Sequence, residues 1–239
     1  MKPSYSEKFR LRISDFDIYD NVTPCCALDL FQDVAGKHAD MIGVGFDEMI
    51  KRDLIWVLIR TKVEFLRPIG LYSTVKVITW PKEKGRMDFD REYEILDEKN
   101  NVCVKAISKW VVVNFKTRRI SFAKDVSYKC QILSKTNYPD SIARLEDFDI
   151  ADCEIYKTRT TFSDLDHNGH INNVNYAKYV LNALKLNKEE NILSFEINYV
   201  KELKEDKEIA LYFKKEGKTY FVKALSDDVL IFIANVKLK

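Results

Sequence analysis

Two stretches of the chain, one in each half, carry apolar residues at helical spacing. In the first, apolar positions recur at intervals of three and four over 28–42, after a Thr23-Pro24 pair that is typical of a helix start. In the second, the same intervals occur over 174–184, with Asn172 or Asn173 as the cap. Each pattern predicts a helix with one apolar face, which must pack against another element.

Segments rich in β-branched and aromatic residues follow each predicted helix and predict strands separated by short turns. They are 55–65, 73–80, 89–96 and 102–115 in the first half, and 195–200, 209–213, 220–225 and 229–236 in the second. Helices and strands are segregated along the chain, which favours an α+β fold over a doubly wound α/β sheet. The longest apolar run, 229–234, has the length of a strand, whereas a membrane helix needs ~20 residues.

A polar motif stands before both predicted helices and indicates an internal repeat. Residues 14–22 read SDFDIYDNV and residues 163–171 read SDLDHNGHI. The strands that follow, around 63–68 and 197–202, are also alike. We therefore expect two diverged copies of one structural unit. The expected division is a first domain at 1–120, an irregular connector at 121–152 and a second domain at 153–239.

The second copy of the motif differs from the first at positions suited to chemistry. Asn168 and His170 stand where the first copy has Tyr19 and Asn21, while the acidic framework that includes Asp166 is kept. Taken alone, such a motif is most simply an Asx-rich turn that caps a helix. The difference between the copies indicates that the second half carries a chemical function and the first a structural or binding one.

The segment from Asp166 to Tyr176 resembles the signature of the fatty acyl-ACP thioesterases of bacteria and plants. Its Asp166-x-Asn168-x-His170 pattern is followed by Ile-Asn-Asn, and the stretches 56–60, 79–81 and 109–111 also resemble that family. The similarity covers nearly the whole chain. It implies two tandem hotdog domains, each an antiparallel sheet wrapped around a long helix. It also implies hydrolysis of fatty acyl-ACP, with acyl-chain binding in the first domain and catalysis in the second.

The same resemblance implies that Asp166, Asn168 and His170 are catalytic, together with a glutamate about thirty residues on, which Glu202 matches. The cysteine that often follows this glutamate in the family is Leu203 here, so the sequence supports a scheme that uses water. We expect Glu202 to act as the base, Asn168 and His170 to stabilise the substrate, and Asp166 to orient a partner. Two observations count against Glu202. It opens a charged run that is typical of solvated turns, and strict strand alternation places it on the face away from the helix, unless a bulge intervenes.

Some conspicuous residues are expected to be structural. His38 lies on the apolar face of the first predicted helix, where it is a packed histidine or lines the acyl cavity. His167 is expected to be a loop residue. Cys25, Cys26 and Cys103 are expected to be small buried apolar residues.

Composition narrows the classes of partner and compartment. The formal net charge of +2 argues against a nucleic-acid or membrane binder held by bulk charge. The five cysteines are odd in number and form no C-x-x-C pair, and no apolar signal region opens the chain, so a cytoplasmic location is expected. Because the sequence has neither a phosphate-binding glycine loop nor a metal-ligand set outside the motif, no cofactor and no metal are expected.

The expected partner is acyl carrier protein with a phosphopantetheine-linked fatty acyl chain, without membrane insertion. Two alternatives stay open, a hotdog thioesterase that acts on acyl-CoA and a non-catalytic acyl-binding hotdog module. A hotdog dehydratase is disfavoured, because its usual histidine and Gly-Pro arrangement is missing. A homodimer is neither required nor excluded by the sequence.

Overall fold

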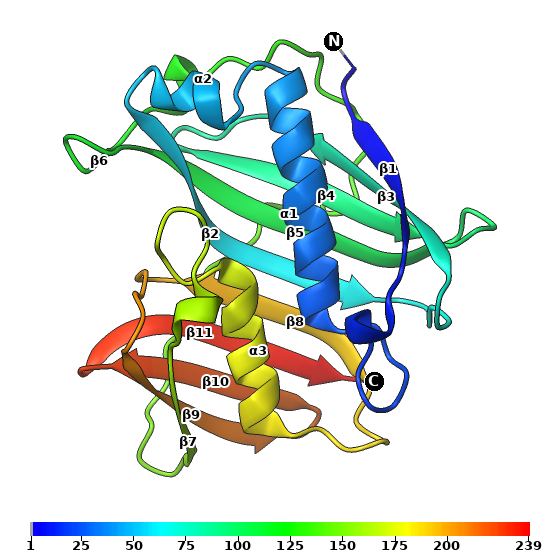
Figure 1. Cartoon of the computed structure of the whole chain (residues 1–239), viewed down its shortest axis with the longest axis vertical. Helices are drawn as coiled ribbons and strands as arrows, with labels where there is room; N and C mark the ends of the chain where they lie inside the picture. Colours follow the sequence, from blue (N-terminus) through cyan, green and yellow to red (C-terminus); the bar gives the residue numbers. More distant parts are fainter. Residues whose placement is uncertain (1) are drawn as a thin grey trace. The chain divides into compact units, whose positions relative to one another are not determined.

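The computed structural model describes residues 2–239, which form two compact units (Figure 1). The first unit extends to Ile142 and the second runs from Ala143 to Lys239. Each unit combines one long helix with an antiparallel sheet, so the predicted α+β class is confirmed. The boundary falls inside 121–152, the segment that was expected to connect two domains.

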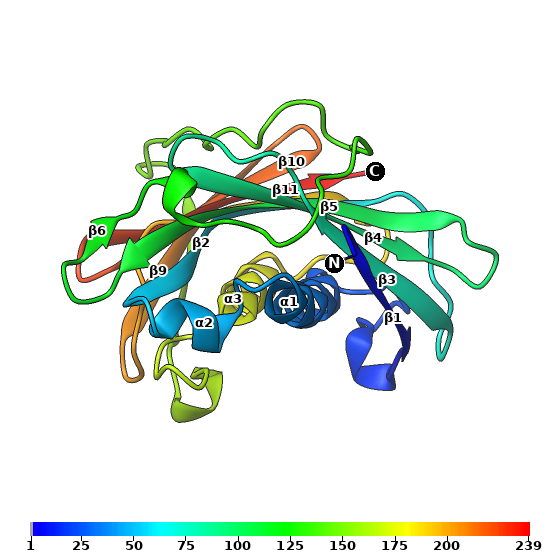
Figure 2. The ribbon, with the colours of Figure 1, turned by 90° about the horizontal axis from the view of Figure 1, so that it is seen from above.

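The first unit is an antiparallel sheet that holds a long helix on one face. Its strands are β1 (Tyr5–Arg10), β2 (Leu54–Phe65), β3 (Thr74–Pro81), β4 (Asp88–Leu96), β5 (Val102–Asn114) and β6 (Arg119–Ile120), and its helices are α1 (Pro24–Met41) and α2 (Phe46–Ile50). The strand order is β1-β3-β4-β5-β2, and the short β6 pairs with β5. Figure 2 shows α1 against the concave face of this sheet.

Helix α1 begins where the sequence predicts. The Thr23 hydroxyl accepts a hydrogen bond from the Cys26 N–H at 3.1 Å, and Pro24 occupies the first helical position. The apolar face of the helix packs on the sheet, where the ring of Phe31 lies 4.7 Å from that of Tyr93 on β4. The short helix α2 lies in the long connection between α1 and β2, where the sequence predicts no element.

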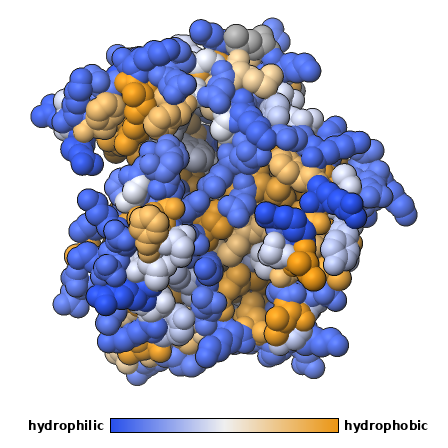
Figure 3. All heavy atoms as spheres, viewed as in Figure 1, coloured by the Kyte–Doolittle hydropathy of each residue, from blue (hydrophilic) through white to orange (hydrophobic). Residues whose placement is uncertain are grey.

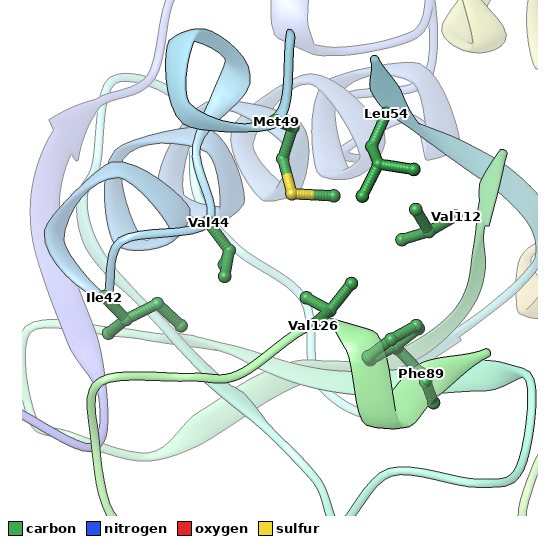
Figure 4. Packing of buried hydrophobic residues seen from close by; sticks show 8 residues of the cluster. Ile42, Val44, Met49, Leu54, Phe89, Val112 and Val126 are labelled. Carbon is green, nitrogen blue, oxygen red and sulfur yellow. The ribbon is translucent and has the colours of Figure 1, made fainter. Parts of the chain in front are cut away.

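A cluster of buried apolar side chains lies beyond the end of α1. Figure 4 shows its members directed toward one another from the α1–α2 connection, α2, the sheet and the segment after β6. The Trp56 ring packs edge-on against Phe89 at 4.8 Å and widens the cluster. The buried members are Ile42, Val44, Met49, Leu54, Phe89, Val112, Ala123 and Val126.

His38 is a fully buried residue of α1, which agrees with the first of its two expected placements, a packed histidine. Its Nδ1 accepts a hydrogen bond from Arg91 Nη1 at 3.0 Å, because a guanidinium can only donate. The Nε2 atom therefore carries the proton and donates to the Lys2 carbonyl at 3.2 Å. Burial and the Arg91 charge lower the pKa of His38 to about 4, so the ring is neutral at pH 7.

The cysteines have no disulfide partners within residues 2–239. Cys26 and Cys103 are buried as predicted, whereas Cys25 is only partly buried. Burial raises the pKa of the Cys26 thiol to about 12 and also raises the pKa of Cys103. The cytoplasmic location inferred from the cysteine pattern stays a prediction.

The second unit repeats the plan of the first with a shorter long helix. Its strands are β7 (Glu154–Arg159), β8 (Ile192–Tyr199), β9 (Glu208–Glu216), β10 (Thr219–Ser226) and β11 (Val229–Leu238), and its long helix is α3 (Asn173–Leu184). The strand order is β8-β11-β10-β9-β7, antiparallel throughout. Asn172 caps α3 by accepting the Val174 N–H at 3.1 Å, and Lys185 ends it in the left-handed conformation.

The face of the first sheet that points away from α1 carries a row of buried carboxylates. Asp90, Glu92 and Glu94 alternate along β4 with residues that face α1. Chain from the expected connector covers them. Lys135 Nζ lies 2.6 Å from Glu94, the Thr136 hydroxyl donates to Glu92 at 2.6 Å, and Ser141 bonds Asp90. We call residues 135–142 the first strap.

A second piece of the connector lies on the second unit. Asp147 pairs with Lys223 of β10 at 2.7 Å, and the ring of Phe148 lies 6.3 Å from that of Phe221. Lys223 also donates to the Phe148 carbonyl at 3.2 Å. We call residues 147–149 the second strap. The first strap therefore packs on the first unit, and the second strap packs on the second unit.

Polar side chains cover most of the face shown in Figure 3, and apolar side chains gather in several patches between them. Ile18 and Phe162 are the most exposed large apolar residues among residues 2–239. Scattered exposed apolar residues are ordinary on protein surfaces. None of the helices in this part of the chain has both the length and the apolar character to cross a membrane.

Candidate active site

The turn that precedes α3 is organised by the carboxylate of Asp166. One oxygen, Oδ1, accepts the backbone N–H groups of Asn168 at 2.8 Å and of His170 at 3.3 Å. The other oxygen accepts the side-chain amide of Asn168 at 3.3 Å. The turn closes with the Asp166 N–H donating to the His170 carbonyl at 2.8 Å. Gly169 lies at φ +74°, a conformation that glycine adopts without strain.

The first unit contains the same turn without the same side chains. Asp17 Oδ1 accepts the N–H groups of Tyr19 at 2.8 Å and Asn21 at 2.9 Å, and the Asp17 N–H donates to the Asn21 carbonyl. Asp20, at φ 63°, takes the place of Gly169. The predicted repeat is thus confirmed for this turn, since both copies form the same hydrogen bonds around their aspartate. The shared aspartate builds the turn in both units, and only the second turn presents an asparagine and a histidine.

A β-bulge at the end of β8 decides the position of Glu202. The N–H groups of Val200 and Lys201 both donate to the Ile231 carbonyl, at 2.8 and 3.1 Å, so one extra residue enters the strand. The strict alternation of faces along β8 therefore ends before Glu202. The expectation that Glu202 lies on the face away from α3 depended on that alternation. The Glu202 Oε2 atom lies 3.6 Å from Nε2 of His170.

The structure thus brings Asp166, Asn168, His170 and Glu202 into one neighbourhood within the second unit. His170 and Glu202 form a pair, and both side chains are open to solvent, with 38% and 55% of their surface exposed. Asp166 is tied to the backbone of the turn rather than to this pair. The Asn168 amide bonds Asp166, and no hydrogen bond within residues 2–239 joins it to His170 or Glu202.

Two further residues hold this arrangement and were not identified from the sequence as functional. The Leu203 N–H donates to the Tyr176 hydroxyl at 3.2 Å, and the Leu203 carbonyl accepts the Ile171 N–H at 2.9 Å. In the sequence, Tyr176 is noticed only as the last residue of the motif. Leu203 is noticed only because it occupies the position at which the resembled family often has a cysteine. Their contact joins α3 to the segment after β8, so no local pattern could have revealed it.

The site can perform acid–base chemistry on a substrate that approaches from solvent. A carboxylate at 3.6 Å from an imidazole provides a proton acceptor and a hydrogen-bonding partner in one place. The side chain of Asn168 presents amide N–H donors at the same turn. Donors of this kind stabilise an oxygen that gains negative charge, as a carbonyl oxygen does when its carbon is attacked.

Each half of the chain matches one domain of a known protein family. Residues 2–129 match the family described as "Acyl-ACP thioesterase N-terminal domain", and residues 148–230 match "Acyl-ACP thioesterase C-terminal domain". The oleoyl-acyl carrier protein thioesterase of Coriandrum sativum is 31% identical over 200 residues, which cover 76% of this chain and 54% of the relative. An acyl-[acyl-carrier-protein] hydrolase of Cuphea viscosissima is 28% identical, over 76% of this chain and 47% of the relative. The chain thus spans about half the length of these curated relatives.

Solved structures show the same fold over the full chain. An acyl-ACP thioesterase from Bacteroides thetaiotaomicron superposes with a TM-score of 0.84 at 22% identity, covering 99% of this chain and 98% of that one. The 12:0-ACP thioesterase of Umbellularia californica gives 0.86 at 21% identity, covering 100% and 98%. These matches confirm the predicted fold of two tandem hotdog domains. With both of its halves matching the domains of one family, the chain belongs to the acyl-ACP thioesterases.

Proposed function

We propose that this chain hydrolyses the thioester of fatty acyl-acyl carrier protein and releases a free fatty acid and holo-ACP. The observation that carries the proposal is the contact between His170 and Glu202, at 3.6 Å, beside the Asp166 turn. Family membership supports it, and so do the printed names of the matched relatives, which are acyl-ACP thioesterases and hydrolases.

In the proposed mechanism, Glu202 takes a proton from a water molecule as the water oxygen attacks the thioester carbonyl carbon. Asn168 and His170 stabilise the negative charge that develops on the carbonyl oxygen. The carbon–sulfur bond then breaks, and the phosphopantetheine sulfur leaves as a thiol with the proton that Glu202 received. Asp166 holds the turn that presents Asn168 and His170. The proposed nucleophile is water, because the residue after Glu202 is Leu203 and offers no thiol at that position.

We propose further that the first domain, expected at 1–120, binds the acyl chain and the second, expected at 153–239, performs the hydrolysis. The first unit carries a cluster of buried apolar side chains that includes Phe89 and Val112 (Figure 4). Its copy of the turn has Tyr19 and Asn21 in place of Asn168 and His170. The missing counterparts of Asn168 and His170 count against a chemical step in that unit, which leaves acyl-chain binding as its proposed role.

Thiol release from a panel of purified acyl-ACPs of increasing chain length tests the proposed activity, with the same acyl groups on CoA assayed beside them. We expect a higher kcat/KM with the carrier-protein substrates. Faster turnover of acyl-CoA would identify a CoA thioesterase instead. Acyl binding without thiol release from any substrate would identify a non-catalytic module.

Three variants test the residues. We expect His170→Ala and Glu202→Ala each to lower kcat by about 10²- to 10⁴-fold, the usual contribution of a positioned acid or base. Glu205→Ala is the matched control, because Glu205 is an exposed carboxylate of the same charged run. We expect it to retain full activity. Near-normal turnover by Glu202→Ala would exclude Glu202 as the base.

A further inference from the structure

The backbone of Leu203 is fixed at both of its polar groups. Its N–H donates to the Tyr176 hydroxyl at 3.2 Å, and its carbonyl accepts the Ile171 N–H at 2.9 Å. Leu203 directly follows Glu202, and Ile171 directly follows His170. The two hydrogen bonds thus lie one residue away from the two side chains that meet at the candidate active site.

Tyr176 is itself held firmly within the second unit. It is only 3% exposed and lies on α3 with its ring edge-on to those of Tyr199 at 5.7 Å and Phe232 at 5.5 Å. Burial raises the pKa of its hydroxyl to about 12, so the group stays a neutral phenol at pH 7. A ring packed in this way fixes the position of the oxygen to which Leu203 is bonded.

The first unit provides an internal comparison for this contact. The bulge after β2 repeats the one after β8, since the N–H groups of Leu66 and Arg67 both donate to the Cys103 carbonyl. The backbone framework is therefore the same at this place. Residues that follow the two bulges correspond, so Pro68 matches Glu202 and Ile69 matches Leu203.

The fixing contacts themselves do not repeat. Ala27 of α1 stands where α3 has Tyr176, so no hydroxyl is present. Within the described part of the first unit, no hydrogen bond joins the Val22 N–H to the Ile69 carbonyl, the counterpart of the Ile171–Leu203 bond. The contacts occur in the unit that has His170 and Glu202 and not in the unit that lacks them.

Glu202 needs such an anchor because it lies outside the regular hydrogen bonding of β8 and β9. It lies in an exposed loop between β8 and β9, flanked by the exposed Lys201 and Lys204. A carboxylate on a loose loop samples many positions, and a misplacement of about 1 Å can lower a rate about 10²-fold. The backbone bonds at Leu203 restrict that freedom one residue from the carboxylate.

We propose that Tyr176 is a positioning residue, which holds Glu202 against His170 through its hydrogen bond to the Leu203 N–H. The inference rests on the proposed function, because it assigns to Tyr176 the placement of the proposed base. It acts through the backbone of Leu203 and does not touch the substrate.

Tyr176→Phe removes the hydroxyl and keeps the packed ring. We expect kcat with acyl-ACP to fall by about 10- to 100-fold while KM stays within about twofold, since only the placement of the base changes. Tyr199→Phe is the matched control, because it removes a hydroxyl from the same aromatic cluster, one that donates to the Asn173 carbonyl at 3.4 Å, and leaves the Leu203 N–H contact in place. We expect that variant to keep kcat within about twofold.

A double variant separates positioning from a general structural role. In a Glu202→Ala background, Tyr176→Phe should lower kcat by less than about twofold, because the group that it positions is gone. A loss by the same factor in both backgrounds would overturn the inference. So would a kcat of Tyr176→Phe within about twofold of the unmodified protein when Glu202→Ala is strongly impaired.

Amide hydrogen exchange gives a readout that does not depend on activity. The Leu203 amide should exchange faster in Tyr176→Phe, and unchanged protection would overturn the inference. Full activity of Glu202→Ala would overturn the proposed base and the positioning role together, whereas loss in Glu202→Ala alone would overturn only the role of Tyr176.

Discussion

Nε2 of His170 and Oε2 of Glu202 lie 3.6 Å apart, where a polar turn meets the bulged end of β8. Glu202→Gln distinguishes two roles that this contact allows. Glutamine can still accept a hydrogen bond from His170, but it cannot take a proton from water at neutral pH. We expect kcat to fall by about 10²-fold or more, with KM changed only a few-fold. A variant that keeps more than about a tenth of the activity would indicate that Glu202 orients His170 instead.

The two copies of the turn provide a matched pair of variants. Asp166→Ala and Asp17→Ala each remove a carboxylate that accepts two backbone N–H groups. We expect each to lower the free energy of unfolding by about 1 kcal/mol, because these hydrogen bonds are exposed or only part-buried. Only Asp166→Ala should also lower kcat, by about tenfold or more, since only that turn presents Asn168 and His170. Denaturation in urea and steady-state kinetics measure the two effects. Equal effects on kcat would contradict a special role for the second turn.

His38 makes stability depend on pH. Because its pKa is about 4 in the folded chain and about 6.5 when exposed, the unfolded state binds more protons between these values. Stability is therefore lost as pH falls through this window and is constant above it. His38→Gln keeps an acceptor for Arg91 and a donor for the Lys2 carbonyl without titrating.

Between pH 7 and pH 5, we expect the unmodified chain to lose about 2 kcal/mol more than His38→Gln. Urea denaturation followed by tryptophan fluorescence measures this difference in the relevant unit, since Trp56, Trp80 and Trp110 all belong to the first unit. Parallel pH profiles for the two proteins would show that His38 is not the source.

Thiol alkylation should leave the activity intact. The thiolate is the reactive form of cysteine, and burial raises the pKa of Cys26, Cys103, Cys130 and Cys153. Leu203 stands where a nucleophilic thiol would be expected from the family resemblance. We expect most of the activity to survive iodoacetamide at neutral pH, with the extent of modification followed by mass spectrometry. Inactivation in step with the modification of one cysteine would contradict a mechanism that uses water.

The α+β class and both long helices were predictable, because periodicity and caps such as Thr23 and Asn172 are local properties of the chain. Glu202 was harder to place. Its position depends on two N–H groups that converge on Ile231, a residue of another strand, so alternation within β8 alone gives the wrong face. The buried acids of β4 were missed for a similar reason. Glu92 is satisfied by Thr136, which lies in a stretch without periodicity.

The two straps carry opposite charges to their sheets. Lys135 meets the acidic row of the first unit, whereas Asp147 meets Lys223 of the second. If the two copies of the repeat were exchanged along the chain, Lys135 would face a lysine and Asp147 a row of acids, and like charges would repel. The copies have therefore ceased to be interchangeable. The charges of the connector therefore fit only one order of the two copies along the chain.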